Sequence, residues 1–274
     1  MQNVQRSGIF VSAFNTAQIH RECGLKHVEF HPTLESTSKL AQELSAELAH
    51  LTPALVLAET QTAGRGRGDH SWWASDGALT FTLVLDVAET RLSPERQSLI
   101  ALGVGAAVRR VIAVHTGAEC RIKWPNDVHL QGRKVCGILT EQKVIDGTSL
   151  VLIGVGINVN NSLAVAPEEV RMLATSVFDV TGRSVSLTEF LITTLNSIQS
   201  QIDRLANDHT ELIHEINAHN LLHNQLVDIQ SVDRLTHGRC VGISHSGALQ
   251  LQTTEGLRDV ISGSVIRFED PQAI

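Results

Sequence analysis

The chain has 274 residues, 42% hydrophobic and 19% charged, which is enough for one large domain with a sizeable core or for a domain plus a smaller one. A formal net charge of −7 argues against a general nucleic-acid binder, so any anion must be bound by a local cluster of cations. No apolar run is long enough to span a bilayer and no secretory signal is visible, so we expect a cytoplasmic protein with no membrane partner.

The cysteines and histidines give no sign of a disulfide framework or of a metal site. The four cysteines are widely spaced and form no C-x-x-C pair, which favours reduced thiols. The histidines after position 200 are scattered and show no H-E-x-x-H or similar ligand spacing. The ligands of any metal ion therefore remain unknown at this point.

The N-terminal part of the chain contains little periodic structure. Residues 1–26 mix polar and apolar side chains without a sustained period, and we interpret them as a tail or a loosely packed extension. Residues 27–31 predict a short strand that Pro32 closes.

Three hydroxyl residues precede the first predicted helix. Ser36, Thr37 and Ser38 suit an N-cap, and leucines spaced four apart behind them give the helix one apolar face. Capping accounts for one of the three hydroxyls. The other two are candidates for hydrogen bonds to a polar ligand at the helix N-terminus.

A glycine–arginine loop, GRGRG at residues 64–68, follows a predicted strand at residues 54–58. Glycines let the backbone turn tightly and approach a ligand, and arginines bind phosphate or carboxylate through a planar fork of donors. We interpret the loop as a mobile cover for an anionic substrate. It is not a Walker loop. Gln61, just before it, carries an amide that could bind a ureido or amide group.

The middle of the chain predicts a buried helix and several strands. After Trp72 and Trp73 comes a strand at residues 79–85, and the helix covers residues 99–114. Further strands are predicted at residues 120–124, 134–142 and 150–160. Lys123 lies near a strand end, where α/β proteins place ligands. Glycines inside strands mark a close approach of a ligand or neighbour, and here they are Gly137, Gly154 and Gly156.

The last third of the chain changes character near residue 220. A capping box at residues 186–189 begins a long amphipathic helix, and a second helix covers about 210–219. From about residue 222, short strands separated by turns predict a small antiparallel barrel. The predicted strands are residues 226–229, 238–243, 248–253, 258–261 and 265–268.

Three segments in order resemble the signature blocks of biotin protein ligases: AETQTAGRGRG with the following tryptophan, KWPNDVHLQGRKVCGIL, and GVGINVN. The resemblance covers about residues 28–270. It implies an α/β (α+β) fold, in which a mixed sheet flanked by helices, related to class II aminoacyl-tRNA synthetases and lipoate ligases, precedes a small SH3-like β-barrel. The implied divisions are an N-terminal extension at 1–26, a catalytic biotin- and ATP-binding domain at 27–220, and the SH3-like domain at 221–274.

The resemblance also implies the chemistry and the partners. Biotin and MgATP would give biotinyl-5'-AMP and pyrophosphate, and a lysine of a biotin carboxyl carrier protein would then take the biotin and release AMP. The family's sheet-edge pairing makes a homodimer an option that no residue here decides. The winged-helix domain of repressor-type ligases has no room before residue 28, so we expect a ligase without operator binding.

Roles for single residues follow from the same resemblance. Lys134 matches the main catalytic cation, and the other implied catalytic residues are Arg65, Arg67 and Lys123. The implied biotin-binding residues are Ser36, Thr37, Ser38, Gln61, Arg65, Gly66, Arg67, Lys134, Gly137, Gly154 and Gly156. The implied ATP-binding residues are Arg67, Trp72, Lys123, Asn126 and Asn158.

The sequence departs from the family pattern in the loop. Gly68, Asp69, His70 and Ser71 stand where a glycine and a basic residue usually precede the tryptophan, and Ser38 replaces a frequent asparagine. Two alternatives remain beside the ligase. The first is a lipoate ligase-like acyl-adenylating enzyme, and the KWPND block and the barrel argue against it. The second is a non-catalytic biotin-binding module, and the presence of all four cations, Arg65, Arg67, Lys123 and Lys134, argues against it.

Overall fold

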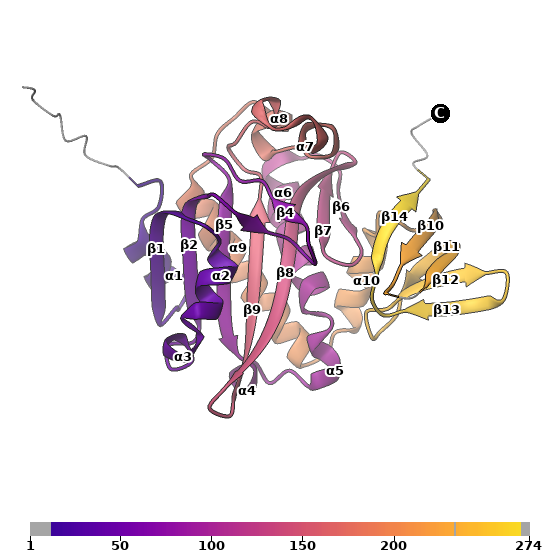
Figure 1. Cartoon of the computed structure of the whole chain (residues 1–274), viewed down its shortest axis with the longest axis horizontal. Helices are drawn as coiled ribbons and strands as arrows, with labels where there is room; N and C mark the ends of the chain where they lie inside the picture. The colour runs from indigo at the N-terminus through magenta and orange to yellow at the C-terminus, as the bar shows by residue number, and fades with distance from the viewer. Residues whose placement is uncertain (1–11, 233, 270–274) are drawn as a thin grey trace, which may run out of the picture.

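The structure, a computed structural model, describes residues 12–232 and 234–269. A seven-stranded mixed sheet forms its centre (Figure 1). From one edge to the other, its strands are β1 (His27–Leu34), β2 (Ala54–Gln61), β5 (Leu79–Asp86), β9 (Thr148–Ile157), β8 (Arg133–Ile145), β7 (Asp127–Leu130) and β6 (Cys120–Lys123). β1 and β2 run parallel and all other neighbours run antiparallel, as expected for the predicted mixed sheet.

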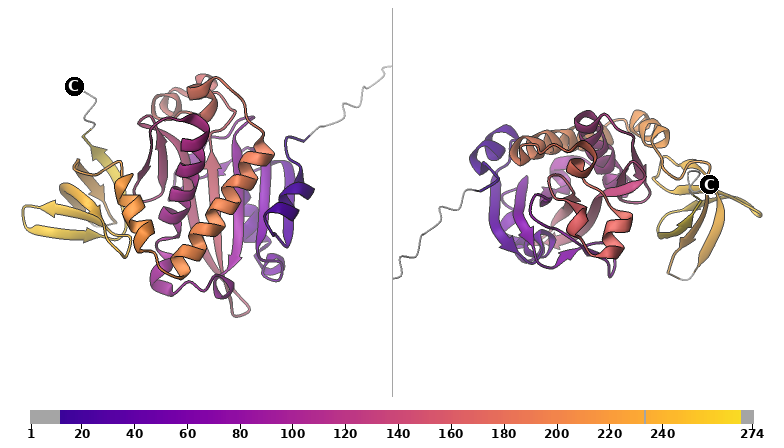
Figure 2. Two further views of the ribbon diagram at one scale, coloured as in Figure 1. Left: turned by 180° about the vertical axis from the view of Figure 1, so that it is seen from behind. Right: turned by 90° about the horizontal axis from the view of Figure 1, so that it is seen from above.

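Helices cover both faces of this sheet. The long helices α6 (Ile100–Thr116) and α9 (Leu187–Ala206) cross the back face, as Figure 2 shows from behind. On the front face, α2 (Thr37–Glu43) packs over β2, β5 and β9. The shorter helices are α1 (Thr16–Glu22), α3 (Ser45–Leu48), α4 (Val87–Thr90), α5 (Pro94–Gln97), η1 (Leu163–Val165), α7 (Glu168–Leu173), α8 (Val177–Thr181) and α10 (Thr210–Ala218). Within the described ranges, no helix combines the length and apolar character needed to cross a bilayer.

The pattern of β2 explains why its part of the sheet is buried on both faces. Successive side chains of a strand point to opposite faces. Leu55 and Leu57 join the main core with α6 and α9, whereas Ala54 and Val56 join a second apolar cluster under α2. The continuous apolar run seen in the sequence is therefore a strand covered on both sides. Farther along the sheet, the front face over β7, β8 and β9 lies beside the cavity described below.

A second, five-stranded antiparallel sheet forms a small C-terminal domain at one end of the molecule (Figure 1). Its strands are β10 (Leu226–Gln230), β11 (Leu235–Ile243), β12 (Leu249–Thr253), β13 (Gly256–Val260) and β14 (Ser264–Phe268). The predicted run of short antiparallel strands is confirmed. Trp124, which is buried, joins the two sheets because its indole Nε1 donates to the carbonyl of Gly247 over 3.1 Å.

Two expectations about the N-terminal part are wrong. Residues 12–26 are not a loose extension, because α1 packs against α9 and buries Ile19 completely. Residues 1–11 lie outside the described ranges. The first strand also does not end at Pro32 but continues to Leu34. β1 is an edge strand, where a residue without an N–H donor is tolerated.

Candidate active site

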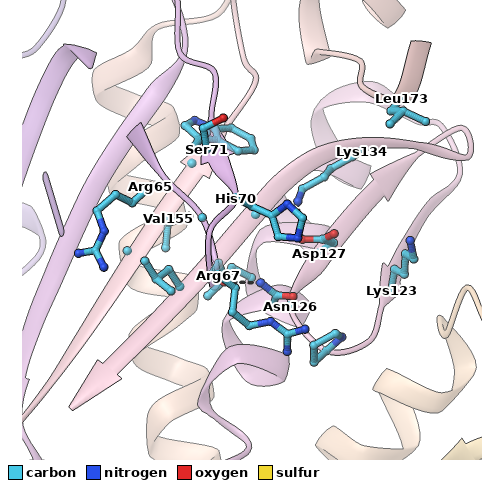
Figure 3. A pocket seen from close by; sticks show the side chains of 18 of the residues that line it. Arg65, Arg67, His70, Ser71, Lys123, Asn126, Asp127, Lys134, Val155 and Leu173 are labelled. Atoms are coloured by element: carbon cyan, nitrogen blue, oxygen red, sulfur yellow. Dashed lines mark hydrogen bonds and ion pairs between the residues drawn. The ribbon is translucent and has the colours of Figure 1, made fainter. Parts of the chain in front are cut away.

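A cavity of about 620 Å³ lies on the front face of the large sheet (Figure 3). Its floor comes from β7, β8 and β9, and residues of the small domain line one side. A hairpin of two very short strands, β3 (Gly64–Arg65) and β4 (Ser71–Trp72), lies over it. We call this hairpin, residues 64–72, the lid. The predicted glycine–arginine loop is thus the turn of a hairpin.

One end of the cavity carries the cluster of hydroxyls and the amide. The Ser36 side chain caps α2, as predicted, while Thr37 and Ser38 turn to Thr82 of β5. Gln61 is nearly buried, and its Oε1 accepts the backbone N–H of Thr37 over 2.7 Å. These side chains are held by one another, which fixes the direction of the donors and acceptors that face the cavity.

Glycines make the floor flat and allow neighbouring side chains to lie directly against it. A Cβ at Gly154 would lie 2.5 Å from the Ser38 hydroxyl, and one at Gly156 would overlap the Trp72 ring. The indole of Trp72 therefore lies directly on β9, and its Nε1 is buried without a partner among the described residues. Gly137 of β8 also faces this ring, which would lie 3.4 Å from a Cβ at that position. The close approach predicted for these glycines is present, with protein side chains as the neighbours.

The hairpin between β7 and β8 positions the central cation. Gln131 and Gly132 form its two-residue turn, both with positive φ, as in the tight turns that match strand twist. Lys134 follows on β8, and its Nζ lies 2.7 Å from Oδ1 of Asp127 on β7. Both side chains face the cavity in Figure 3. An ammonium group paired in this way is held in one place at the floor.

Lys123 stands beside this pair, at the end of β6. Burial lowers its pKa, the carboxylate of Asp127 opposes that effect, and Lys134 adds to it. Its Nζ lies 4.8 Å from the ring centroid of Phe268 on β14, within cation–π range. Two lysines thus share one carboxylate, which leaves an excess of positive charge for an anion.

The two arginines of the lid point in different directions. Arg65 points away from the Lys134–Asp127 pair in Figure 3, and its guanidinium lies 3.3 Å from Glu141. Arg67 is half buried and donates from Nη2 to the carbonyl of Gly263 and to Oγ of Ser264, the latter over 3.0 Å. Burial lowers the pKa of Arg67, and Asp127 partly offsets this.

All but one of the predicted site residues line the cavity, and the exception is Asn158. Its Nδ2 donates to the carbonyl of Thr175, its Oδ1 accepts from Asn161, and the side chain is buried. Asn126 lines the cavity, although its Nδ2 donates to the carbonyl of Ile138 over 2.7 Å. The Asn158 side chain is therefore buried among residues 158–175, where it bonds to the chain after β9, and does not line the cavity.

Several lining residues were not predicted. Asp127 belongs to the same signature block as Lys123. The two residues pair across the turn between β6 and β7, so a hairpin at that turn would place both side chains on one face of the sheet. His129 lies two residues further on the same strand, hence on the same face. Others come from the strands and turns of the sheet, namely Trp124, Pro125, Gly132, Arg133, Ile138, Leu139 and Val155. A last group comes from the lid, from α7 and from the small domain, and no local pattern marks its members: His70, Ser71, Met172, Leu173, Ser264, Val265 and Phe268.

The arrangement suits a ligand with three chemically different parts. Across the sheet lie first the hydroxyls and the amide over β9, then the flat glycine floor with its aromatic neighbour, then the cations on β8, β7 and β6. A neutral polar head, an apolar body and an anionic tail would meet complementary groups in that order. Excess positive charge beyond the tail would accept a second anion.

Comparison with known proteins agrees with this interpretation. Residues 30–158 match the model of the biotin/lipoate A/B protein ligase family, and residues 223–267 match that of the biotin protein ligase C terminal domain. A biotin–[acetyl-CoA-carboxylase] ligase of Paracoccus denitrificans is 33% identical over 240 residues, which is 82% of this chain and 96% of the relative. The bifunctional ligase/repressor BirA of Bacillus subtilis is 31% identical over 245 residues, 88% of this chain and 74% of the relative.

A solved structure supports the same assignment. The biotin protein ligase of Aquifex aeolicus, determined in complex with biotin and ATP, superimposes with a TM-score of 0.72 at 26% identity. The match covers 89% of this chain and 98% of the other. The second matched domain and the named relatives separate this chain from the lipoate ligases that share the first family model. The chain belongs to the biotin protein ligase family.

Proposed function

We propose that the protein activates biotin with MgATP to biotinyl-5'-AMP and pyrophosphate, and then transfers biotin to a lysine of a biotin carboxyl carrier protein or domain. The observation that carries this proposal is the order of groups in the cavity. Hydroxyls and an amide at one end, a flat floor in the middle and lysines at the other end match the ureido head, the ring and chain, and the carboxylate of biotin.

Biotin recognition is assigned to the end nearest α2. The Oε1 of Gln61 is engaged by Thr37, which leaves the amide nitrogen to donate to the ureido oxygen. The hydroxyls of Ser36 and Ser38 complete a set of groups that can donate or accept. Ring and chain would lie along the glycine floor beside Trp72, with the carboxylate directed to Lys134.

In the first step, a carboxylate oxygen of biotin attacks the α-phosphorus of ATP, and the bond to pyrophosphate breaks. Negative charge builds on the α-phosphate, and fixed cations aimed at it lower the barrier. Lys134, Lys123 and Arg67 are the cations proposed for this task. Magnesium, when bound, would screen the remaining phosphates, and Asp127 is the lining carboxylate suited to hold it together with substrate oxygens and water.

In the second step, a lysine amine of the carrier attacks the activated carbonyl, and AMP leaves with the bonding electrons. The mixed anhydride must be protected from water between the two steps, and the lid is placed to do this. We assign the chemistry to residues 27–220 and place the small domain from residue 221. Four free cysteines support a reducing compartment, so we infer a cytoplasmic location.

A pyrophosphate-release assay tests the first step. Biotin and ATP together should release pyrophosphate, whereas ATP alone or ATP with lipoate should not. Labelled biotin should then appear on a carrier domain only when ATP is present. Absence of adenylate at saturating biotin would overturn the enzyme assignment, and a preference for lipoate would overturn the substrate.

A further inference from the structure

The lid has few backbone contacts of its own. Its two strands pair at only two positions, Gly64 with Trp72 and Arg65 with Ser71. Two more backbone bonds close the turn, from Gly66 N to His70 O at 2.7 Å and from His70 N to Arg67 O at 3.4 Å. An isolated hairpin of this size is at best marginally stable in water. Its position over the cavity must therefore depend on side chains that reach other parts of the molecule.

The contact with the longest reach in sequence is that of Arg67. Its Nη2 donates to the carbonyl of Gly263 and to Oγ of Ser264, which are 196 and 197 residues further along the chain. Both acceptors lie at the turn between β13 and β14 of the small domain, which we call the acceptor turn, residues 261–264. A charged donor shared by two oxygens gives a directional bond.

The acceptor turn is itself firmly placed. The carbonyl of Ser262 accepts the Ser231 hydroxyl over 2.7 Å. A Cβ at Gly263 would lie 2.6 Å from Cγ2 of Ile229 and 2.9 Å from the carbonyl of Gln230, so the turn packs closely against β10. The oxygens offered to Arg67 thus belong to a braced segment and can define where the guanidinium lies.

We propose that Ser264, together with the carbonyl of Gly263, is a positioning element for the lid arginine, so that the small domain sets how long the adenylate is retained. This inference rests on the proposed ligase function. Arg67 has five N–H donors, and bonds from one nitrogen to the acceptor turn leave others for a phosphoryl group. Losing the hydroxyl would let the guanidinium move and the lid open more often.

A second cation of the site also meets the small domain. Lys123 lies under the ring of Phe268, at the far end of β14 from Ser264. One strand of the small domain therefore touches two of the three cations proposed for the first step. This agrees with β14 acting as one wall of the adenylate site.

The test measures the half-life of enzyme-bound labelled biotinyl-5'-AMP after dilution into excess unlabelled biotin. Ser264→Ala should release it about threefold to tenfold faster, because a hydrogen bond to a half-exposed charged group contributes less than a buried one. Ser264→Thr, which keeps the hydroxyl, should restore the half-life. Ser262→Ala, an exposed hydroxyl on the same turn, is the matched control and should match the wild type.

A double-mutant cycle separates positioning from general stability. In an Arg67→Ala background, Ser264→Ala should have no further effect on release, since its partner is gone. An equal effect in both backgrounds, or an unchanged half-life in Ser264→Ala, would overturn the proposal. A raised KM for the carrier with unchanged half-life would instead assign the turn to carrier docking. If the wild type forms no adenylate at all, it is the ligase proposal that fails.

Discussion

The floor and the lid of the site are built by different means. The floor belongs to β7, β8 and β9, and β9 pairs with β8 along its whole length inside the seven-stranded sheet. The lid has two paired positions and is placed by side chains such as Arg67 and Trp72. Backbone pairing fixes the shape of the floor, whereas side-chain bonds leave the lid adjustable. Recognition of biotin and retention of its adenylate are therefore expected to respond to different substitutions.

The largest expected effect is on the floor. Gly156→Val places carbon atoms where the Trp72 ring already lies, and β9 cannot retreat because β5 and β8 hold it on both sides. Biotin affinity should fall by more than about a thousandfold, because the new side chain also occupies ligand space. Titration calorimetry measures this. Gly137→Ala, which meets the flexible end of Lys134, should cost less than about tenfold. Normal affinity of Gly156→Val would contradict the assigned floor.

The next effect separates chemistry from binding on the same floor. Lys134→Ala should slow adenylation by a barrier increase of about 2–4 kcal/mol, while biotin affinity changes little. Pyrophosphate release and calorimetry report the two quantities. Lys143→Ala is the control on the same strand, because its Nζ bonds to the carbonyl of Gln42 outside the cavity. Adenylation by Lys134→Ala at the wild-type rate would remove this residue from the mechanism.

A pH experiment compares a floor histidine with a lid histidine. Burial lowers the pKa of His129 from 6.5 to about 4, so the folded protein binds this proton less tightly than the unfolded chain. Neutral His129 therefore contributes fully to the free energy of unfolding above pH 6.5. This contribution, up to about 3 kcal/mol, is lost as the pH falls from 6.5 toward 4. His129→Gln should flatten this part of the profile in urea unfolding, whereas His70→Gln, exposed on the lid, should not. If the unfolding free energies of His129→Gln and the wild type depended on pH in the same way, protonation of His129 would not be coupled to unfolding.

The smallest effect distinguishes the two lid arginines. Arg67→Gly should release adenylate about tenfold faster and label proteins nonspecifically, because its bonds to the small domain are lost. Arg65→Gly should change release by less than about threefold, since its ion pair with Glu141 is partly open to solvent and contributes little. Adenylate half-life and streptavidin blots of bystander proteins report both. An unchanged half-life in Arg67→Gly would detach the lid from retention.

Local patterns in the sequence predicted most elements of the fold. The helix from Ser186 and the five strands of the small domain are present, because capping and alternation act over a few residues. The two errors at the N-terminus concern tertiary context. Burial of Ile19 depends on α9, and tolerance of Pro32 depends on the edge position of β1.

Site residues could be predicted where a signature block fixes both the residue type and its place in the chain. Lys134 and the floor glycines lie at the cavity as the motif order implies. Asn158 could not be separated from the true lining residues, because it lies two residues after Gly156 and strand alternation would place it on the same face. β9 ends at Ile157, and beyond that point the side chain turns to the carbonyl of Thr175. Ser264 and Phe268 approach the site from across the molecule, and no sequence period links residues so far apart in the chain.

The indole of Trp124 has a consequence for attempts to make a minimal enzyme. It belongs to the same signature block as Lys123, yet its Nε1 bonds to Gly247 of the small domain, and its ring is only 2% exposed. Deleting the small domain would leave this donor without its carbonyl and bring a large aromatic surface into water. The Trp124–Gly247 contact therefore stabilises both domains, and a fusion that transfers the catalytic domain to another protein should include the small domain.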